Sequence, residues 1–393
     1  MTSEKKSPNP WLMIALVWFA SVAAPLNMVK VPACPVDLCM TYGIDPAGIG
    51  FLMSAYTITG IFMGLPGGWM IRKLGVRKTA VLALSVSAIG AIGSCFAPTF
   101  TMLMFFRVFE GIGVCVLGAI GITVAHGFFP PEKHGISVAI ACSYFAGIAC
   151  VGTPILSMIC DNFGMHTTYV VCAVYNVIAI VVALFLKEPP VQEKAPSEKR
   201  SMWGVIKAHP ALWLNCIVFF IHNFCIVGVV NNFGTTYLTT VVGLSQSTAS
   251  LMSAIMALCS TLVLFVSGTL SDKLGTRKKL VFFAIAFSCI GVAAVFNMTG
   301  MAAIGICFAI AGIGSGMNTN MLQAIGPELV DDPEEKPIVP GLQAVFQNAG
   351  QFIAASTFGT VAVAVGFGTA ALIMCVPLYI IAFICTIALK NVK

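Results

Sequence analysis

The stretch that decides the fold is GWMIRKLGVRK at residues 68–78, because it returns in degenerate form as GTLSDKLGTRK at residues 268–278. Both copies keep the leading Gly, a Lys-Leu-Gly step and a closing Arg-Lys pair. The copies stand about half a chain apart, and each follows a long apolar run. An internal repeat of this kind predicts two structurally related halves. The central Gly75 and Gly275 each allow a tight turn at a helix end.

The sequence around these two segments consists mainly of apolar runs. Of 393 residues, 58% are hydrophobic and only 9% are charged, whereas soluble domains carry about 25% charged residues. Apolar runs of roughly 20 residues are long enough to cross a bilayer core of about 30 Å. We therefore predict an all-α membrane protein with twelve spans, at 11–36, 46–71, 79–97, 100–127, 135–160, 166–186, 210–240, 247–271, 279–298, 300–326, 338–364 and 367–389.

The predicted spans fall into two sets of six around one polar break. Residues 187–209 are rich in Lys, Glu, Pro and Ser, which predicts a linker between an N-terminal bundle at 1–186 and a C-terminal bundle at 210–393. The apolar run that starts at Trp11 is too long for a cleavable signal segment, so we expect it to be the first span.

The basic residues predict the orientation in the membrane. Of the 21 Lys and Arg residues, 19 fall in loops or at the first residue of a span, on the side that carries both termini. The positive-inside rule places that side in the cytoplasm, and we expect a plasma membrane location, the inner membrane of a bacterium. The net charge of +6 then reflects orientation, and we expect no nucleic-acid partner.

With these spans in place, the chain resembles the major facilitator superfamily over essentially its whole length. The signature loop of that family reads roughly G-x-x-x-D-R-x-G-x-R-K between helices 2 and 3, and residues 68–78 fit it with Arg72 in place of the acid. The second copy keeps its acid as Asp272. In the family this loop is a cytoplasmic latch, so the resemblance implies latch roles for Gly68, Arg72, Gly75, Arg77, Asp272, Gly275 and Arg277. Because Arg72 cannot make the usual charge pair, the N-terminal latch is either weaker or uses another acid.

Two further segments carry the resemblance. Residues 107–113, RVFEGIG, resemble the second family motif, R-x-x-x-G-x-G. Residues 27–32 together with residues 64–68 are similar to bacterial permeases grouped with cyanate and nitrate carriers. The resemblance implies a secondary carrier that works by alternating access, with helices 1, 4, 7 and 10 around a central cavity.

Lys30, Arg107 and Glu110 are the charges well inside the predicted spans. A charge in mid-membrane costs at least ~2.5–3.5 kcal/mol, so each is a functional hypothesis by default. Lys30 and Arg107 lie at similar depths, roughly 10 Å below the outer end, and both belong to expected cavity helices. We therefore predict that they bind an anion. Two alternatives stay open: Lys30 reaches the outer headgroups, or Arg107 is only the structural partner of Glu110, one turn away.

Glu110 is the predicted proton carrier. An anion that arrives at Arg107 would compete for the partner of Glu110 and favour protonation of its carboxylate. This sequence of events is a mechanism for proton symport, and anion exchange is the other possibility.

The C-terminal half carries amides where the N-terminal half carries cations. We predict that Asn223, Asn231, Asn318 and Gln347, together with Asn27 in the first half, contact the substrate. The alternative is that these amides hold helices together, a contribution of about 0.6 kcal/mol each.

The sequence shows no phosphate-binding loop, metal-ligand cluster or nucleophile elbow, so we expect neither an enzyme nor a bound cofactor or metal. The first prediction is a monomeric secondary active transporter for a small anion, either an organic carboxylate or a cyanate- or nitrate-like ion. The alternative is a proton-coupled efflux antiporter for drugs or metabolites, against which the excess of buried cations counts. A membrane sensor would need an added soluble domain, and an intramembrane enzyme would need a set of catalytic residues. We expect neither.

Overall fold

The computed structural model describes residues 8–130, 133, 137, 140–141, 143–189, 204, 207–274, 277–330 and 339–389. Inside helices it leaves undescribed the side chains at positions 64, 65, 68, 72, 114, 115, 146, 265, 268, 269 and 272–274. Over the described residues the chain is helical, without a strand, as the sequence predicts.

The N-terminal half begins with three short helices in a row, α1 (Pro10–Ser21), α2 (Ala23–Ala33) and α3 (Pro35–Tyr42). They are followed by α4 (Pro46–Leu74), α5 (Val76–Cys95), α6 (Phe100–Phe128), α8 (Tyr144–Gly147), the π-helix η2 (Ile148–Gly152) and α9 (Thr153–Ala183). The C-terminal half comprises α11 (Pro210–Asn223), the π-helix η3 (Phe224–Asn231), α12 (Asn232–Thr240), α13 (Gln246–Leu274), α14 (Arg277–Val295), α15 (Met301–Glu328), α16 (Val339–Val365) and α17 (Phe367–Ala388).

Eleven stretches of the described chain are long and apolar enough to cross a membrane. One of them, Ile148–Ala183, is 36 residues long and contains a break at Gly164, where φ is 80° and the backbone leaves the helical region. Glycine adopts this positive φ without the steric cost that other residues meet. The break divides the stretch into two spans, so the described residues agree with the twelve predicted spans.

Two of the helix interruptions lie at a proline. Pro35 lacks a backbone N–H, and α2 ends just before it, at Ala33, so that the first span bends between α2 and α3. In the fifth span, Pro154 is the second residue after η2, in the first turn of α9. A proline leaves the carbonyl four residues earlier without its helical partner, and a π-helical turn is one way for the backbone to adjust.

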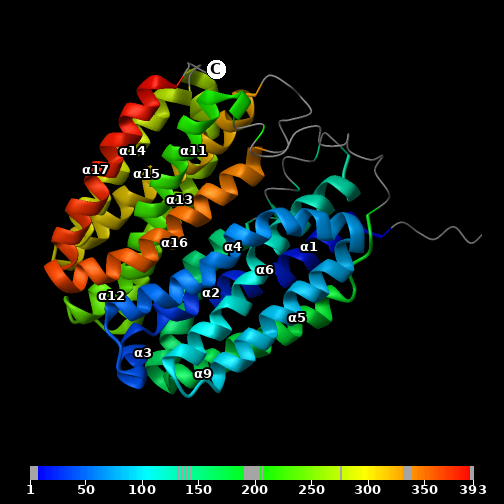
Figure 1. The fold of residues 1–393 in the computed structure, drawn as a ribbon, viewed down its shortest axis with the longest axis horizontal. Helices are drawn as coiled ribbons and strands as arrows, with labels where there is room; N and C mark the ends of the chain where they lie inside the picture. Colours follow the sequence, from blue (N-terminus) through cyan, green and yellow to red (C-terminus); the bar gives the residue numbers. More distant parts are fainter. Residues whose placement is uncertain are drawn as a thin grey trace, which may run out of the picture.

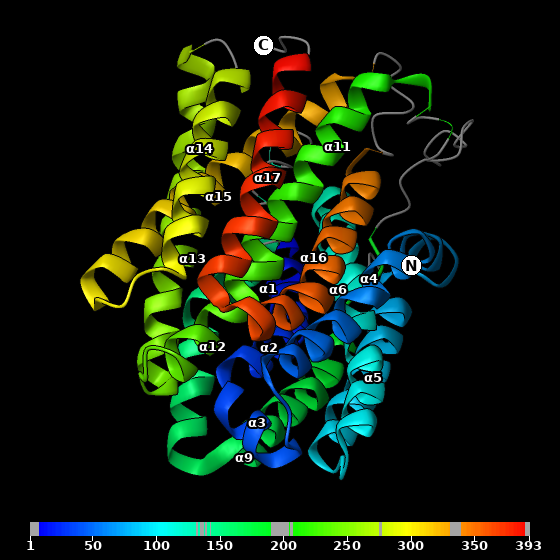
Figure 2. The same cartoon turned by 60° about the vertical axis from the view of Figure 1, so that its left-hand side comes forward.

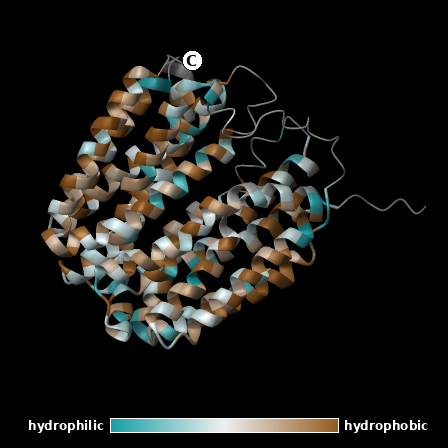
Figure 3. Cartoon of the chain, viewed as in Figure 1, coloured by the Kyte–Doolittle hydropathy of each residue, from teal (hydrophilic) through white to brown (hydrophobic). Residues whose placement is uncertain are grey.

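The helices form two bundles that lie side by side (Figure 1). We call the end where α1, α5, α11 and α14 begin the terminal end, and the other end, where α3 and α12 lie close together, the opposite end (Figures 1 and 2). The halves also contact each other along α4 and α16 and along α9 and α13. Hydrophobic residues, shown in brown, are abundant in both bundles (Figure 3). Large apolar side chains such as Phe62 and Ile290 are 65% and 60% exposed. Lipid is the solvent that suits such a surface.

Candidate functional site

The three buried charges form one ion cluster inside the N-terminal bundle. Lys30 Nζ of α2 lies 2.6 Å from Glu110 Oε1, and Arg107 Nη1 lies 2.6 Å from Glu110 Oε2. All three side chains are 0% exposed. Two cations share one carboxylate, so the cluster keeps a net charge of about +1 in a region of low dielectric.

Neighbouring groups form further hydrogen bonds with Glu110 and Arg107. Ser94 of α5 donates a hydrogen bond of 2.6 Å to Glu110 Oε1. Arg107 also donates to two backbone carbonyls, those of Asn27 at 2.6 Å and Leu52 at 3.3 Å. The cluster therefore joins α2, α4, α5 and α6, and breaking it would loosen the whole N-terminal bundle.

An aromatic ring covers each cation. Arg107 Cζ lies 4.5 Å from the ring centroid of Tyr56, and Lys30 Nζ lies 4.4 Å from that of Tyr169. The faces of aromatic rings attract cations, so both positive groups are held by a ring as well as by the carboxylate.

This geometry corrects one expectation from the sequence. Lys30 and Arg107 do not face a common cavity as unpaired cations, because Glu110 lies within reach of both and a buried charge without a partner costs more than a paired one. Lys30 does not reach the headgroups either, since its side chain is 0% exposed. The alternative that Arg107 pairs with Glu110 is confirmed. Whether either cation contacts substrate stays a prediction.

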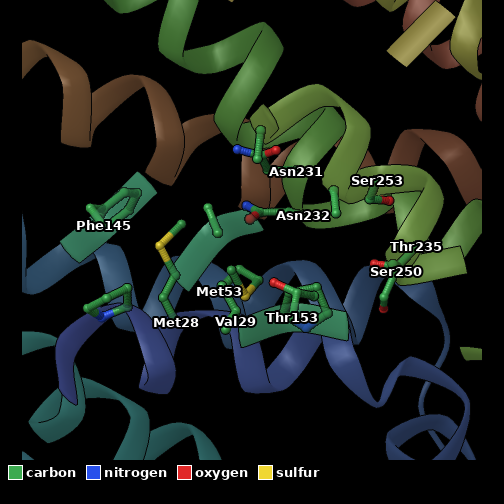
Figure 4. A pocket seen from close by; sticks show the side chains of 15 residues that line it. Met28, Val29, Met53, Phe145, Thr153, Asn231, Asn232, Thr235, Ser250 and Ser253 are labelled. Atoms are coloured by element: carbon green, nitrogen blue, oxygen red, sulfur yellow. The ribbon is translucent and has the colours of Figure 1, made fainter. Parts of the chain in front are cut away.

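A pocket lies between the two halves, next to α2 (Figure 4). Its cavity volume is about 50 Å³, well below the roughly 300–1,000 Å³ of most ligand pockets, so the pocket is narrow in this conformation. The N-terminal half contributes residues of α2, α4, α8, η2 and α9, and the C-terminal half contributes residues of η3, α12 and α13. Its polar lining consists of Thr153, Asn231, Asn232, Thr235, Ser250 and Ser253. No charged residue of the described chain lines it.

Two π-helical turns flank this pocket, one from each half. Ala149 belongs to η2, and Asn231 is the last residue of η3. A π-helical turn holds more residues than an α-helical one and changes the direction of the side chains that follow, which is why such turns are frequent at functional sites. Here η3 is followed directly by Asn232, the first residue of α12.

Among the predicted substrate contacts, Asn231 lines the pocket, and the structure places the others elsewhere. The side chain of Asn27 bonds to Ser87 at 3.1 Å and to Asn176 at 3.2 Å inside the N-terminal bundle. Asn223 accepts a bond of 3.2 Å from Gln351. These contacts match the alternative in which amides hold helices together.

The remaining two predicted contacts lie in α15 and α16. Asn318 bonds to the ring of His222 at 3.1 Å, and its own Oδ1 has no partner among the described residues. Gln347 is partly exposed. Neither residue lines the pocket.

Hydrogen bonds between the halves join them at the opposite end, beyond the pocket. Asp161 at the end of the fifth span accepts a bond of 2.8 Å from the backbone N–H of Ser247, in the first turn of α13. The Gln246 amide donates to Asp161 at 3.3 Å and to Asp37 of α3 at 3.4 Å. One half thus caps a helix of the other, and Ser157 and Ser250 also bond across the halves one helical turn deeper.

The predicted latch residues that the structure describes lie at the terminal end. Gly75 has φ of 84° between α4 and α5, as its tight turn requires. Arg277 forms an ion pair with Glu328 at the end of α15. Gly275 lies outside the described residues, as do the side-chain positions of Gly68, Arg72 and Asp272. The latch function of these residues stays a prediction.

Sequence reasoning missed Glu188, which follows the sixth span. Its carboxylate accepts two backbone bonds at the start of α5, from Val76 at 2.7 Å and from Arg77 at 3.0 Å. An anion at a helix N-terminus satisfies free N–H groups and complements the helix dipole. The signal was an acid directly after a span, but nothing in the sequence shows that it returns to the loop at Gly75.

We expect the Glu188→Ala variant to be less stable by about 1 kcal/mol, the usual cost of losing a helix cap. Thermal unfolding of the purified protein measures this effect. Lys187→Ala is the matched control, because Lys187 is the adjacent exposed residue and does not cap α5. Equal stability of the two variants would show that the Glu188 contacts contribute nothing.

Known proteins resemble the chain throughout its length. The profile of the Major Facilitator Superfamily matches residues 11–355 and again residues 223–392. The "Probable galactarate/D-glucarate transporter GudP" of Bacillus subtilis is 24% identical over 316 residues, covering 71% of this chain and 68% of the relative. A "Probable nitrate/nitrite transporter NarK2" of Mycobacterium tuberculosis is 23% identical over 277 residues, covering 68% and 66%. The matched region thus spans about two thirds of the length of these relatives.

Solved structures show the same fold. A bacterial homolog of the human lysosomal transporter Spinster, in an inward-facing conformation, matches with a TM-score of 0.79 and 16% identity, covering 96% of this chain and 97% of the other. A point mutant of the nucleoside transporter NupG matches with a TM-score of 0.78 and 14% identity, covering 97% and 99%.

Proposed function

This chain belongs to the Major Facilitator Superfamily, and we propose that it is a secondary active transporter that moves a small anion across the membrane by alternating access. The pocket between the halves is the proposed binding site. Both halves of one chain build it, so a monomer is sufficient. We place the terminal end in the cytoplasm of a bacterial cell, on the positive-inside rule.

The observation that carries the choice of an anion is the net charge of about +1 behind the pocket wall. Met28, Val29 and Pro32 of α2 line the pocket, whereas Lys30 points from the other side of this helix toward Glu110. A helix is about 10 Å wide. A unit charge at that distance attracts an anion by about 1.7 kcal/mol at an effective dielectric constant of about 20. The same field repels cations, which counts against an exporter of cationic drugs.

Several of the relatives support this proposal. Their names describe carriers of galactarate and glucarate, of nitrate and nitrite, and, in a Pseudomonas aeruginosa protein 23% identical over 186 residues, of 4-hydroxybenzoate. All of these substrates are small anions. A preference for negative charge is therefore compatible with both an organic carboxylate and an inorganic ion as the substrate.

Glu110 is the proposed proton carrier. With its carboxylate ionised the cluster carries about +1, and protonation would raise this to about +2, which is unfavourable unless an anion has entered nearby. Anion binding and protonation would then favour each other equally, since such coupling is reciprocal. Proton symport follows from this coupling, and exchange of one anion for another is the mode that does not require it.

Purified protein in liposomes tests the proposal. We expect a labelled carboxylate to enter by counterflow, faster than in liposomes without protein, and to accumulate when the outside is acidic. A hydrophobic cation is the control for charge preference. Uptake of that cation together with no uptake of any anion would contradict the proposed function.

A further inference from the structure

The pocket contains buried polar atoms that no described residue satisfies. Both amide atoms of Asn232, Nδ2 and Oδ1, lack a hydrogen-bond partner, as do the hydroxyl groups of Thr235 and Ser253. Asn232 and Thr235 are only 1% and 2% exposed, and all three residues line the pocket (Figure 4). More than about 90% of buried polar groups in proteins are hydrogen-bonded, so this cluster of unpaired atoms in one pocket points to a ligand.

In the same helix, other threonine hydroxyl groups bond to backbone carbonyls of the helix itself. Thr239 and Thr240 donate to the carbonyls one turn back, at 3.0 Å and 2.7 Å. Thr235 follows the π-helix η3 and makes no such bond. Its neighbour Thr236 is also buried and unpaired, but it does not line the pocket. Thr236 is therefore a matched control for Thr235.

The chemistry of the amide limits the ligand. Whichever way the Asn232 amide is turned, it offers donors on one atom and an acceptor on the other. A bare carboxylate, nitrate or cyanate only accepts hydrogen bonds at neutral pH, so it would pair with Nδ2 and leave Oδ1 buried without a donor. An ammonium group would supply a donor, but the buried charge of about +1 repels it. A neutral hydroxyl group supplies a donor without this cost.

We infer that the substrate is a hydroxylated carboxylate, whose hydroxyl groups bind Asn232, Thr235 and Ser253. The negative charge of this substrate is inferred from the proposed function, and its hydroxyl groups are inferred from the pocket lining. A site built to bond a hydroxyl group rejects the analogue that lacks it, because its own polar atoms are then left unpaired. We expect a preference of about 10- to 100-fold for the hydroxylated molecule.

Four probes separate charge from hydroxyl groups in the full chain reconstituted in liposomes. Succinate carries charge only, erythritol carries hydroxyl groups only, tartrate carries both on the same four-carbon skeleton, and nitrate is an inorganic anion. Counterflow of each labelled probe gives its relative rate, and the rise in melting temperature on addition of each probe reports binding without transport. We expect tartrate to exceed the other three in both measurements.

Variants locate the preference. Thr235→Val and Ser253→Ala remove hydroxyl groups with little change of shape, and each should reduce the preference for tartrate over succinate by about 10-fold, whereas Thr236→Val should keep it. Equal counterflow of succinate and tartrate, or nitrate above both, would overturn the inference and leave the anion carrier in place. Erythritol above tartrate would instead overturn the proposed anionic substrate. An unchanged preference in correctly folded Thr235→Val and Ser253→Ala would overturn the assignment to this pocket.

Discussion

Replacing Glu110 with Gln is expected to destabilise the protein by about 3–5 kcal/mol, because Lys30 and Arg107 would be left buried without a counter-charge. Both cations are 0% exposed and 2.6 Å from the carboxylate, so neither can regain water without moving a helix. The net charge of the cluster would rise from about +1 to about +2. Thermal unfolding of the purified variant measures the loss, together with the yield of protein inserted in the membrane.

A double variant separates charge balance from lost hydrogen bonds. Lys30→Met combined with Glu110→Gln leaves Arg107 alone and restores the net charge of about +1. We expect this variant to recover a clear part of the stability that Glu110→Gln loses, because the two single changes affect groups in direct contact. If the double variant is less stable than Glu110→Gln by the full cost of Lys30→Met alone, repulsion between the cations is not the cause.

The same substitution tests proton coupling. After Glu110→Gln, the described spans have no carboxyl group in their interior that could be protonated. Uptake driven by a pH gradient should therefore be lost, while exchange continues. Counterflow and gradient-driven uptake, measured on one reconstituted sample, distinguish the two. Uphill uptake at the rate of the unmodified protein would remove Glu110 from the coupling mechanism.

The sequence predicts the fold well because its signals are local or repeated. Apolar length marks the spans, and the repeat at Gly75 and Gly275 marks the two halves. Pro35 lies where the first span bends, as a residue without a backbone N–H would suggest. None of these signals requires knowledge of how the helices face each other.

The site is harder to predict because it depends on helix rotation. At 100° per residue, Lys30 and Asn27 lie on one face of α2, and Met28, Val29 and Pro32 lie on the other. A polar face suggests an aqueous cavity, yet in this protein it turns toward Glu110 in the bundle interior, and the apolar face lines the pocket. Burial of a paired charge decides the rotation, and the partner is 80 residues away in the chain.

Asn232 is absent from the predicted substrate contacts for a related reason. The sequence places it next to Asn231, and a regular α-helix would turn the two side chains 100° apart. The π-helix η3 ends between them, and both then line the same pocket. No residue type specifies a π-helical turn by itself, so this change in direction becomes visible only in the structure.

The second large effect is expected at the contact between α4 and α16, where the halves meet. A Cβ atom at Gly50 would collide with the backbone carbonyl of Ala355 and would lie 2.8 Å from the ring of Phe233. The contact is reciprocal, since a Cβ at Gly359 would lie 2.7 Å from Cα of Ala47. Backbone atoms cannot turn aside as a flexible side chain can, so Gly50→Ala should keep the halves apart at the opposite end.

We expect Gly50→Ala to reduce transport by at least about 10-fold, because alternating access requires this end to close in one of its two states. The loss should occur even though Ala favours a helix over Gly by about 1 kcal/mol. Gly305→Ala in α15 is the control, since its new Cβ would meet only Ile255 Cδ1, at an ordinary 3.6 Å. Counterflow and melting temperature together decide the matter. Lost transport with a melting temperature near that of Gly305→Ala indicates blocked closure. A fall in both the transport rate and the melting temperature indicates general misfolding. Full transport would show that α4 and α16 need not approach this closely.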